Sequence, residues 1–467
     1  MTDAPVDDAR RPAPEDNGDP ARPVTPEFVR DIAEALAAGR TADAVERART
    51  LHSADLADLV EALKPDERVA LIGALGPHLD PEVLVDLDEH VRDLVLESIE
   101  PEAIAAHAAE LDTDDATHLI EDLGAAEQQK VLEALPASER ELIESALAYP
   151  ENSAGRLMQR DYVAVPSYWD VGQVIDWLRE TDELPDEFYE IFVVDPRHRP
   201  VGTVPLYRAM RTKRPVSVAE IMDPEPRLIP VDMDQEEVAY QFDQYGLASA
   251  AVVAPDGRLL GQITVDDVVD VIQEEAEEDI HRLGGVAAQG DLYLGPLATV
   301  RRRWIWLLVN LLTAVIASLT IALFTDTIQQ IVALAILMPI VASMGGNAGT
   351  QTLTVAVRAL ATRELTAANA ARMLWKECVV GGTNGILFAI VTGVVAALWF
   401  ESPIIGVVIG LAMIVNLLVA GAAGMLIPLG LQRAGVDPAI SGGIVLTTVT
   451  DVVGFFAFLG LAKLIIL

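Results

Sequence analysis

One acidic side chain, Asp451, lies deep inside an apolar segment near the end of the chain. The segment covers residues 440–466, so Asp451 lies 451 − 440 = 11 residues inside it, about 16 Å along a helix that rises 1.5 Å per residue. An isolated carboxylate at the centre of a membrane costs at least ~2.5 kcal/mol. No Lys or Arg stands at a matching depth. We therefore expect Asp451 to face a water-filled path or an ion.

Further polar residues lie in the apolar segments. The run PIVASMGGNAGTQ brings together Gly345, Gly346 and Asn347. Such residues either allow tight helix packing or open the helix, so that carbonyl groups and an amide line a pore. The run SGGIVLTTVTD contains Thr447, whose hydroxyl either hydrogen-bonds back to its own helix or faces the same path as Asp451. Three single amides are expected to form hydrogen bonds between helices: Asn310, Asn384 and Asn416.

One aspartate cannot hold a divalent cation by itself. A symmetric dimer would place two copies of Asp451 on its axis. Two carboxylates balance the charge of Mg²⁺ and let the ion keep most of its water, which suits an ion that dehydrates reluctantly. The expected chemistry at Asp451 is therefore passage of a hydrated divalent cation through a homodimer.

A second set of carboxylates lies on VDDVVDVIQEEAEEDIHRLGGV, which is expected to form a helix. Its acidic residues recur at spacings of three and four, which place them on neighbouring turns. They are Asp267, Asp270, Glu274, Glu275, Glu278 and Asp279. Like charges at these spacings destabilise a helix by a few tenths of a kcal/mol per pair. The segment is therefore either a solvated helix or a surface compensated by a cation, for which oxygen ligands favour Mg²⁺ or Ca²⁺ over zinc.

Charge is divided unevenly along the chain. The 467 residues carry 33 Lys and Arg against 71 Asp and Glu, a net charge of −38, which argues against nucleic-acid binding. The first 300 residues hold 24 basic and 65 acidic side chains (24 − 65 = −41), and the last 167 hold 9 and 6 (9 − 6 = +3). The single cysteine, Cys378, excludes a disulfide within the chain. A soluble acidic body therefore precedes a part that is apolar enough to lie in lipid.

Residues 26–150 are predicted to form an all-helical domain, because apolar residues recur there at helical spacing. The stretch around Leu63 resembles the one around Leu111 at an offset of 48 (111 − 63), which aligns Asp66 with Asp114. We interpret this repeat as a short right-handed stack of helical hairpins. Its acidic side chains are either solvated or pair with another acidic surface through a divalent cation. Residues 1–25 lack the apolar core of a signal peptide and are predicted to be a disordered tail.

Residues 151–272 contain a tandem repeat with units at 151–213 and 214–272. Met158 aligns with Met222, and Gly202 aligns with Gly261. Each unit is predicted to contain a strand, a helix, an apolar strand, an Asp/Gly turn, a second strand and a helix. The two units resemble a CBS-domain pair, an α+β regulatory module. That resemblance implies a cleft that often binds an adenine nucleotide, and the residues here leave ATP binding open.

Five apolar segments follow an acidic connecting helix at 273–300, and each is long enough to cross a hydrocarbon core of about 30 Å. They cover 304–324, 331–357, 373–400, 404–429 and 440–466. Lys and Arg cluster before the first segment and around the second connection, whereas the connections near Asp326 and Glu401 have none. The positive-inside rule therefore places the N-terminal body in the cytoplasm and the C-terminus outside. Residues 301–467 are predicted to form a five-helix transmembrane domain.

An acidic helical domain, a CBS pair, an acidic connecting helix and five spans, in this order, resemble the MgtE family of magnesium channels and transporters. The runs EEAEEDIHRLGG, GGNAGTQ and TTVTDVVGF share that resemblance. It implies a homodimer in the cell membrane that admits Mg²⁺ down its electrochemical gradient and closes when internal Mg²⁺ is high. The family's pore aspartate falls on Asp451, and its Gly/Asn-rich second span falls on Gly345, Gly346 and Asn347. The implied sensing carboxylates are Asp234, Glu236, Asp267, Asp270, Glu275, Glu278 and Asp279.

Two places depart from the pattern of that family. Gly442 and Gly443 stand where an Asn can precede the pore-lining turn of the last span. Gly246 stands where some members have a further acidic ligand. The residues that form the inner gate are therefore not identified by the resemblance. The sensing residues of the helical domain are not identified by it either.

The sequence also leaves other functions open besides magnesium transport. A CBS-regulated carrier of Mn²⁺ or Co²⁺ is the nearest alternative, because carboxylate and amide ligands discriminate weakly among these ions. A non-transporting membrane sensor is a second alternative, and Asp451 argues against it because a sensor has no need of a carboxylate at that depth. An enzyme is not expected, since the sequence has no phosphate-binding loop, nucleophile elbow or HExxH run.

Overall fold

The computed structural model describes residues 23–181, 184–185, 188–286 and 295–467. The chain divides into two compact units, Met1–Ile272 and Gln273–Leu467, here called the soluble unit and the membrane unit. The predicted N-terminal tail falls almost wholly on residues 1–22, which lie outside the described residues.

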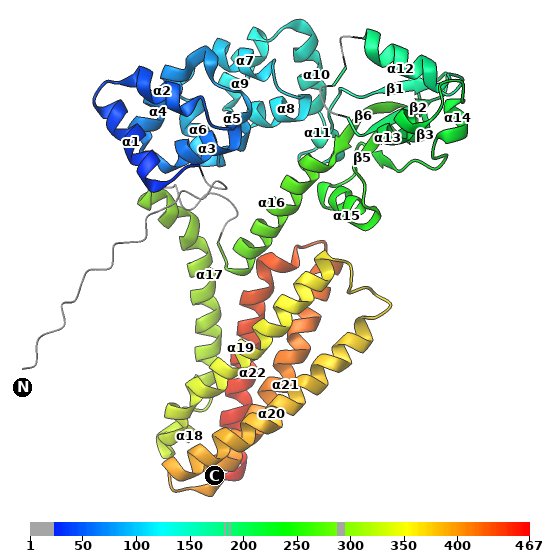
Figure 1. Ribbon diagram of the computed structural model, residues 1–467. Helices are drawn as coiled ribbons and strands as arrows, with labels where there is room; N and C mark the ends of the chain where they lie inside the picture. The colour runs from blue at the N-terminus through cyan, green and yellow to red at the C-terminus, as the bar shows by residue number, and fades with distance from the viewer. Residues whose placement is uncertain (1–22, 182–183, 186–187, 287–294) are drawn as a thin grey trace, which may run out of the picture. The chain divides into compact units, whose positions relative to one another are not determined.

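The first part of the soluble unit is a stack of short helices (Figure 1). They are α1 (Pro26–Ala37), α2 (Thr41–Ala48), α3 (Ser53–Ala62), α4 (Pro65–Leu75), η1 (Gly76–His78), α5 (Glu82–Asp86), α6 (Glu89–Leu96), α7 (Pro101–Ala108), α8 (Thr113–Glu121), α9 (Ala125–Ala134) and α10 (Ala137–Leu147). Proline opens α1, α4 and α7, at a position where its missing N–H has no helical partner to lose. Helices α4 and α8 begin 48 residues apart (113 − 65), and their aligned leucines, Leu71 and Leu119, are fully buried.

The second part of the soluble unit has two three-stranded sheets with the same topology. The first copy contains α11 (Ala154–Leu157), β1 (Ala164–Pro166), α12 (Val171–Glu180), β2 (Glu190–Val194), β3 (Pro200–Pro205) and α13 (Leu206–Arg211). The second contains α14 (Val218–Ile221), β4 (Leu228–Pro230), α15 (Gln235–Tyr245), β5 (Ser249–Val253), β6 (Leu259–Thr264) and the start of α16 (Val265–Leu283). In each sheet the first pair of strands is parallel and the second is antiparallel. The predicted order of elements in the CBS pair is confirmed.

The aligned glycines explain how the two copies are joined. A Cβ at Gly202 would lie 2.7 Å from the carbonyl oxygen of Asp223, and a Cβ at Gly261 would overlap the carbonyl oxygen of Gln159. The β2–β3 hairpin therefore packs against the segment at the start of the second copy, and the β5–β6 hairpin packs against the segment at the start of the first. Only a glycine leaves room for the backbone of that segment. Isolated bridges between Gln159 and Gln262 and between Thr203 and Asp223 complete the exchange.

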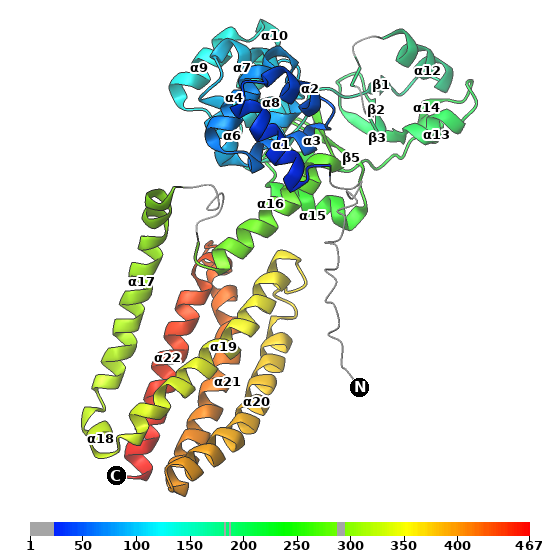
Figure 2. The same ribbon diagram turned by 60° about the vertical axis from the view of Figure 1, so that its left-hand side comes forward.

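The membrane unit contains long helices. They are α17 (Pro296–Ala322), α18 (Thr325–Gln330), α19 (Ala333–Ala361), α20 (Ala370–Trp399), α21 (Pro403–Arg433) and α22 (Pro438–Ile465). All except α18 are long and apolar enough to cross a membrane, which makes five such helices among the described residues. Figure 2 shows α19 to α22 side by side. In the 18-residue apolar stretch of α21, 61% is buried, whereas in that of α17 only 11% is buried. Helix α21 is therefore the core of this unit. Helix α17 leaves most of its surface for lipid or another protein.

Candidate ion path and acidic sensing surface

The pore candidates lie on α19 and α22, which pack against each other. A Cβ at Gly349 would lie 3.0 Å from Leu446, and a Cβ at Gly442 would lie 2.9 Å from Leu353. Residue numbers rise along one helix as they fall along the other, so the helices are antiparallel. On this register Asp451 and Asn347 differ in height by about three residues, or about 4.5 Å. The fold therefore brings these two predicted pore residues, 104 positions apart (451 − 347), to nearly the same depth.

Helix α19 also presents a line of exposed polar side chains. Its members recur at spacings of three and four, which is one helical face. They are Ser343, Asn347, Thr350, Thr354 and Arg358, here called the α19 polar stripe. A polar face of this length is not expected against lipid tails. The stripe therefore marks a surface that meets water or a second protein. Its period was present in the sequence, because Thr354 and Arg358 continue the spacing beyond the run that ends at Gln351.

Gly345 does not belong to that surface. It is buried, and a Cβ there would overlap the amide of Asn416 on α21. Asn416 is fully buried and donates a 2.8 Å hydrogen bond to the carbonyl of Val341 on α19. A Cβ at Gly454 of α22 would also lie 2.8 Å from this amide. The structure favours the packing role for Gly345, whereas Gly346 has open space where a side chain would go.

The single amides differ from one another. The predicted hydrogen bond between helices is confirmed for Asn416. The amide of Asn310 donates to the carbonyl of Trp306 in the same helix, so for this residue a bond between helices stays a prediction. Asn384 is exposed on α20. Sequence alone does not distinguish the three, because the partner of a buried amide lies on another helix.

Of the two alternatives for the glycine-rich runs, an opening of the helix is not seen. Helix α19 is continuous through Pro339 and the Gly/Asn run, and α22 is continuous through Gly442 and Gly443. The Thr447 hydroxyl lies 3.0 Å from the carbonyl oxygen of Gly443, one turn earlier. Thr447 therefore donates back to its own helix, and the lone pairs of its hydroxyl are the part that can still meet water or an ion.

A carboxylate that the sequence analysis missed lies in α20. The side chain of Glu377 is 12% exposed and accepts a 3.1 Å hydrogen bond from the hydroxyl of Thr352 on α19. The ammonium of Lys376 is 4.0 Å away. The sequence alone could have identified Glu377, because it is an acidic residue within the third apolar segment. Its contact with α19 makes it a tie between α20 and that helix.

In the soluble unit, carboxylates from two domains meet. Asp267, in the first turn of α16, faces Asp114 and Asp115 in the first turn of α8. Asp267 accepts hydrogen bonds from the backbone N–H and hydroxyl of Thr264 at 3.2 and 2.7 Å. Asp114 is 7% exposed, and its Oδ1 has no hydrogen-bond partner within the part of the chain that the structure describes. The helical domain thus supplies Asp114 and Asp115, the facing residues that the sequence did not place.

The pKa of each of these carboxyls is raised, chiefly by burial. Burial raises the pKa of Asp267 to about 6, with the charge of Asp266 adding to the effect. Burial raises the pKa of Asp115 to about 7, and the charges of Asp267 and Asp112 raise it further. The pKa of Asp114 is raised well above its usual value by burial and by Asp267. Three carboxyls held together against their mutual repulsion favour a proton or a divalent cation between them.

Asp270, one turn along α16, has a similar relation to the helical domain. Burial is the main cause that raises the pKa of Asp86, and the charges of Glu82 and Asp270 add to it. The pKa of Asp270 is itself raised by burial and by Asp266. Asp267 and Asp270 therefore both face acidic side chains of the helical domain.

The later carboxylates of α16 lie in the membrane unit and have different partners. Arg282 pairs with both Glu278 and Asp437, and Asp437 caps α22 by accepting from the N–H of Ala439 at 2.7 Å. Burial raises the pKa of Asp279, followed by the charges of Asp437 and Glu275. The predicted sensing residues are therefore two groups: Asp267 and Asp270 face the helical domain, and Glu275, Glu278 and Asp279 gather near the first turn of α22.

The remaining sensing candidates have local roles. Asp234 caps α15 by accepting from the N–H of Glu236 at 2.9 Å. Gly246 ends the same helix at φ 61°, a left-handed conformation that favours glycine. No group of three or more His, Cys, Asp or Glu placed to hold a metal ion directly occurs among the described residues.

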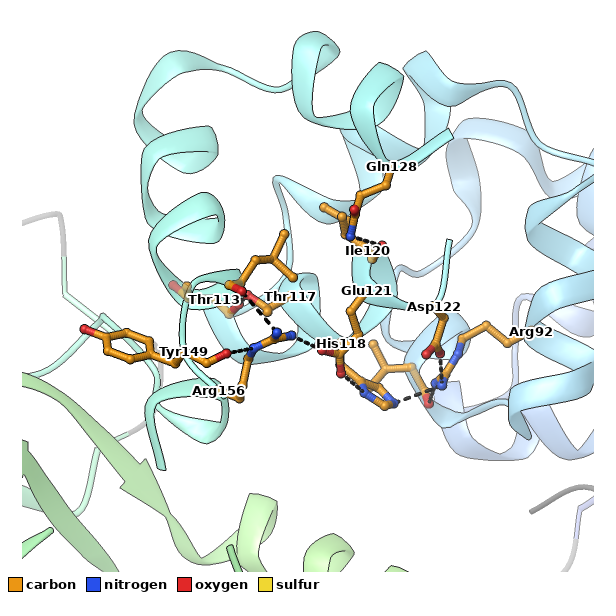
Figure 3. A network of polar contacts seen from close by, with 12 residues as sticks. Arg92, Thr113, Thr117, His118, Ile120, Glu121, Asp122, Gln128, Tyr149 and Arg156 are labelled. Carbon is orange, nitrogen blue, oxygen red and sulfur yellow. Dashed lines mark hydrogen bonds and ion pairs between the residues drawn. The ribbon is translucent and has the colours of Figure 1, made fainter. Parts of the chain in front are cut away.

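Figure 3 shows what fixes α8 in place. Arg92 of α6 donates to Asp122 at 2.6 Å and to Nε2 of His118 at 2.9 Å. Because an arginine only donates, Nε2 of His118 accepts, and its Nδ1 donates to Glu121 at 3.3 Å. Arg156 of α11 pairs with Glu121 from the other side. The helix that carries Asp114 and Asp115 is thus tied both to the helical stack and to the start of the first CBS copy.

Three family profiles match the chain. The profile described as the MgtE intracellular N domain matches residues 51–152, that of the CBS domain matches 218–274, and that of the MgtE divalent cation transporter matches 338–461. The magnesium transporter MgtE of Thermus thermophilus is 35% identical over 340 residues, which cover 72% of this chain and 75% of that protein. The chain belongs to the MgtE family. It is a multi-pass membrane protein of a transporter family, with a helical N domain and a CBS pair.

Two further known proteins are similar to this chain. The magnesium transporter MgtE of Bacillus subtilis is 30% identical over 387 residues, covering 82% of this chain and 84% of that protein. A solved structure of the cytosolic domain of the Mg²⁺ channel MgtE in complex with ATP is 32% identical and has a TM-score of 0.49, covering 52% of this chain and 99% of that chain. The MgtE transporter profile spans Asn347 and Asp451, and the N-domain profile spans Asp114.

Proposed function

We propose that this MgtE protein conducts Mg²⁺ across the cell membrane, down its electrochemical gradient, along a path lined by α19 and α22. The observation that carries the proposal is Asp451, half-buried on α22 at nearly the depth of Asn347 in the α19 polar stripe. A carboxylate in the membrane without a cationic partner needs water or an ion. The names of the Thermus and Bacillus relatives support Mg²⁺ as that ion.

The path is completed by a second copy of the chain. In one protomer the α19 polar stripe is exposed, and a two-fold axis beside it would cover the stripe with its own image. The same axis would bring two Asp451 carboxylates to one ion, which balances its charge. The basic connections place the N-terminal body in the cytoplasm and the C-terminus outside.

Gating is proposed to come from the soluble unit and α16. At low internal Mg²⁺ the carboxylates of Asp114, Asp115 and Asp267 repel one another and the helical domain separates from the second CBS copy. At high Mg²⁺ the ion bridges them and stabilises the compact, closed state through its higher affinity for that state. Moving a two-state gate from 1:99 to 99:1 takes about 5.5 kcal/mol. Several sites acting together are therefore expected, and the Glu275, Glu278 and Asp279 group is proposed as another.

The test of the proposal is Mg²⁺ uptake by purified protein in liposomes. Asp451→Ala is expected to abolish uptake while leaving a folded dimer, because it removes charge but little packing volume. Asp451→Asn should retain little uptake, since an amide accepts hydrogen bonds from hydrated Mg²⁺ but lacks the balancing charge. Asp326→Ala, which removes an exposed acid from α18, is the matched control and should conduct normally. Normal flux in Asp451→Ala would remove this residue from the mechanism.

The alternatives are separated by simple measurements. Uptake of Mg²⁺ in the presence of competing Mn²⁺ or Co²⁺ distinguishes a magnesium path from a carrier of those ions. A protein that binds Mg²⁺ on its soluble unit but shows no flux in liposomes would be a sensor. The family is one of membrane transporters, and no enzymatic role is proposed.

A further inference from the structure

A cleft of about 370 Å³ lies between the two CBS copies. Its walls come from β2 and β3 of the first copy, the segment after α14, the end of α15 and β5. The polar lining residues are Glu190, Asp223, Glu225, Arg227, Tyr245 and Ser249. Clefts of a few hundred Å³ with a few convergent polar groups are typical of small-ligand sites.

The floor of the cleft contains a buried polar atom without a partner. Ser249 is 3% exposed, and its hydroxyl makes no hydrogen bond to any residue in the described ranges. An unsatisfied buried hydroxyl is uncommon because it loses its hydrogen bonds to water without replacement. A ligand in the cleft would supply the missing partner. Ser249 is on a strand rather than among the acidic residues, so it indicates a ligand independently of their charge.

The charge of the lining is predominantly negative. Three carboxylates, Glu190, Asp223 and Glu225, line the cleft beside one arginine, Arg227. The Arg227 guanidinium lies 3.8 Å from the centre of the Tyr245 ring. Burial raises the pKa of Glu190, and the charge of Asp223 raises it further. This carboxylate therefore lies in a site that already disfavours additional negative charge.

A second arginine nearby is committed elsewhere. Arg208, which faces Glu190, donates a 2.9 Å hydrogen bond to the carbonyl of Ile221. A nucleoside triphosphate needs several unoccupied donors for its phosphates, and three carboxylates would repel it. The lining residues therefore do not fit ATP, which the resemblance to CBS pairs had left open.

We propose that this cleft binds a small organic cation, with ammonium or guanidinium groups, as an effector of the transporter. Glu190 and Glu225 would accept from the cationic groups, and the Ser249 hydroxyl would pair with an N–H of the ligand. A cationic group of the ligand would take the place of the Arg227 guanidinium on the face of the Tyr245 ring. The apolar part of the ligand lies along Pro226 and Leu247, which also line the cleft.

The test uses the purified full-length protein and isothermal titration at about 150 mM salt, which screens loose attraction to an acidic surface. Spermidine is the cationic probe, and Mg·ATP is the anionic one. Spermidine is expected to bind at one site per chain, and Mg·ATP is not. Glu225→Gln should weaken spermidine binding about tenfold, because it removes a charge-assisted hydrogen bond, and Ser249→Ala should weaken it several-fold.

Asp256→Asn is the matched control, since it removes an exposed carboxylate of the same CBS copy outside the cleft. The three variants should share the thermal unfolding midpoint of the parent within a few degrees. Two results would overturn the proposal. One is spermidine binding that falls equally in the control and in Glu225→Gln, which would mean attraction to the acidic surface only. The other is saturable binding of Mg·ATP that is lost in Arg227→Ala, which would make the cleft a nucleotide site.

Discussion

Replacing Asp267 by Asn removes one charge from the meeting point of the helical domain and the second CBS copy. The change is nearly isosteric, and the amide oxygen can still accept from the backbone N–H and hydroxyl of Thr264. Asp114 and Asp115 then face a neutral group. We expect the compact arrangement of the soluble unit to form in Asp267→Asn even when Mg²⁺ is absent.

The magnitude follows from the pKa of Asp267. Its rise from 3.8 to about 6 corresponds to about 3 kcal/mol, since one pKa unit is worth about 1.4 kcal/mol. At neutral pH the part of this free energy that comes from burial by the helical domain opposes the compact arrangement, because the ionised carboxylate is better solvated when the domains are apart, so about 3 kcal/mol is its upper limit. One Mg²⁺ site at a hundredfold its Kd contributes about 2.7 kcal/mol, which offsets nearly all of it. The variant should therefore shift the equilibrium toward the compact arrangement without Mg²⁺, by up to about a hundredfold.

The same reasoning predicts that protons substitute for Mg²⁺. Below about pH 4 a carboxyl whose pKa is raised in the compact arrangement is protonated in both arrangements. Its raised pKa then adds no free-energy penalty to the compact arrangement. The penalty grows as pH rises and is complete above about 6 for Asp267 and about 7 for Asp115. Lowering the pH from 8 to 5 relieves at least about 1.4 kcal/mol through Asp267 alone. The compact population should then rise at least about tenfold.

The assay is energy transfer between dyes on the two domains of the full-length protein. Cysteines at Glu97 and Asp256, both exposed, carry the dyes in a Cys378→Ser background. Transfer is measured at pH 5 and 8, with and without Mg²⁺. Asp58→Asn, at an exposed position of α3, removes one charge elsewhere in the helical domain and serves as the control for Asp267→Asn.

Two results would refute the reasoning. Transfer that does not change between pH 5 and 8 without divalent cations would mean that the buried carboxyls do not oppose domain contact. Equal behaviour of the Asp58 and Asp267 variants would mean that total charge, and not the facing group, sets the arrangement.

Two further predictions concern the membrane unit. Gly345→Ala should lower the free energy of unfolding by about 1–3 kcal/mol, because the new Cβ displaces the buried Asn416 amide from its hydrogen bond. Gly346→Ala is the control, because a Cβ there meets no atom within 4 Å. Equal thermal unfolding of the two variants would contradict this packing. A tag before Trp304 should be reachable only from the cytoplasm and a tag after Leu467 only from outside, and accessibility of both from one side would mean an even number of spans.

The two CBS copies show what could be predicted from the sequence. The alignment of Gly202 with Gly261 and of Met158 with Met222 was visible as a repeat, and these four residues form the contacts that join the copies. The order of elements follows from local patterns of apolar residues and turns. The cleft between the copies could not be predicted from these local patterns, because its lining comes from segments as far apart as Glu190 and Ser249.

Neighbouring glycines show where the sequence was insufficient. Gly345 and Gly346 stood together as pore candidates, yet one lies under Asn416 and the other in open space. Adjacent residues on a helix point about 100° apart, so which of the two meets another helix depends on the position of α21. The α19 polar stripe, in contrast, is a property of one helix and was present in the sequence.

By itself the sequence determined which segments are soluble, which are apolar enough for lipid, and which helix carries the acidic run, because composition and periodicity are local. It also determined that Asp451 lies deep in a span, since depth is counted along one helix. Only the tertiary structure decided which carboxylates meet. Asp114 and Asp267 are 153 residues apart (267 − 114), and the first turn of α8 is brought against the first turn of α16 by the packing of two domains. A contact between distant residues depends on every element that positions them, and no local pattern records it.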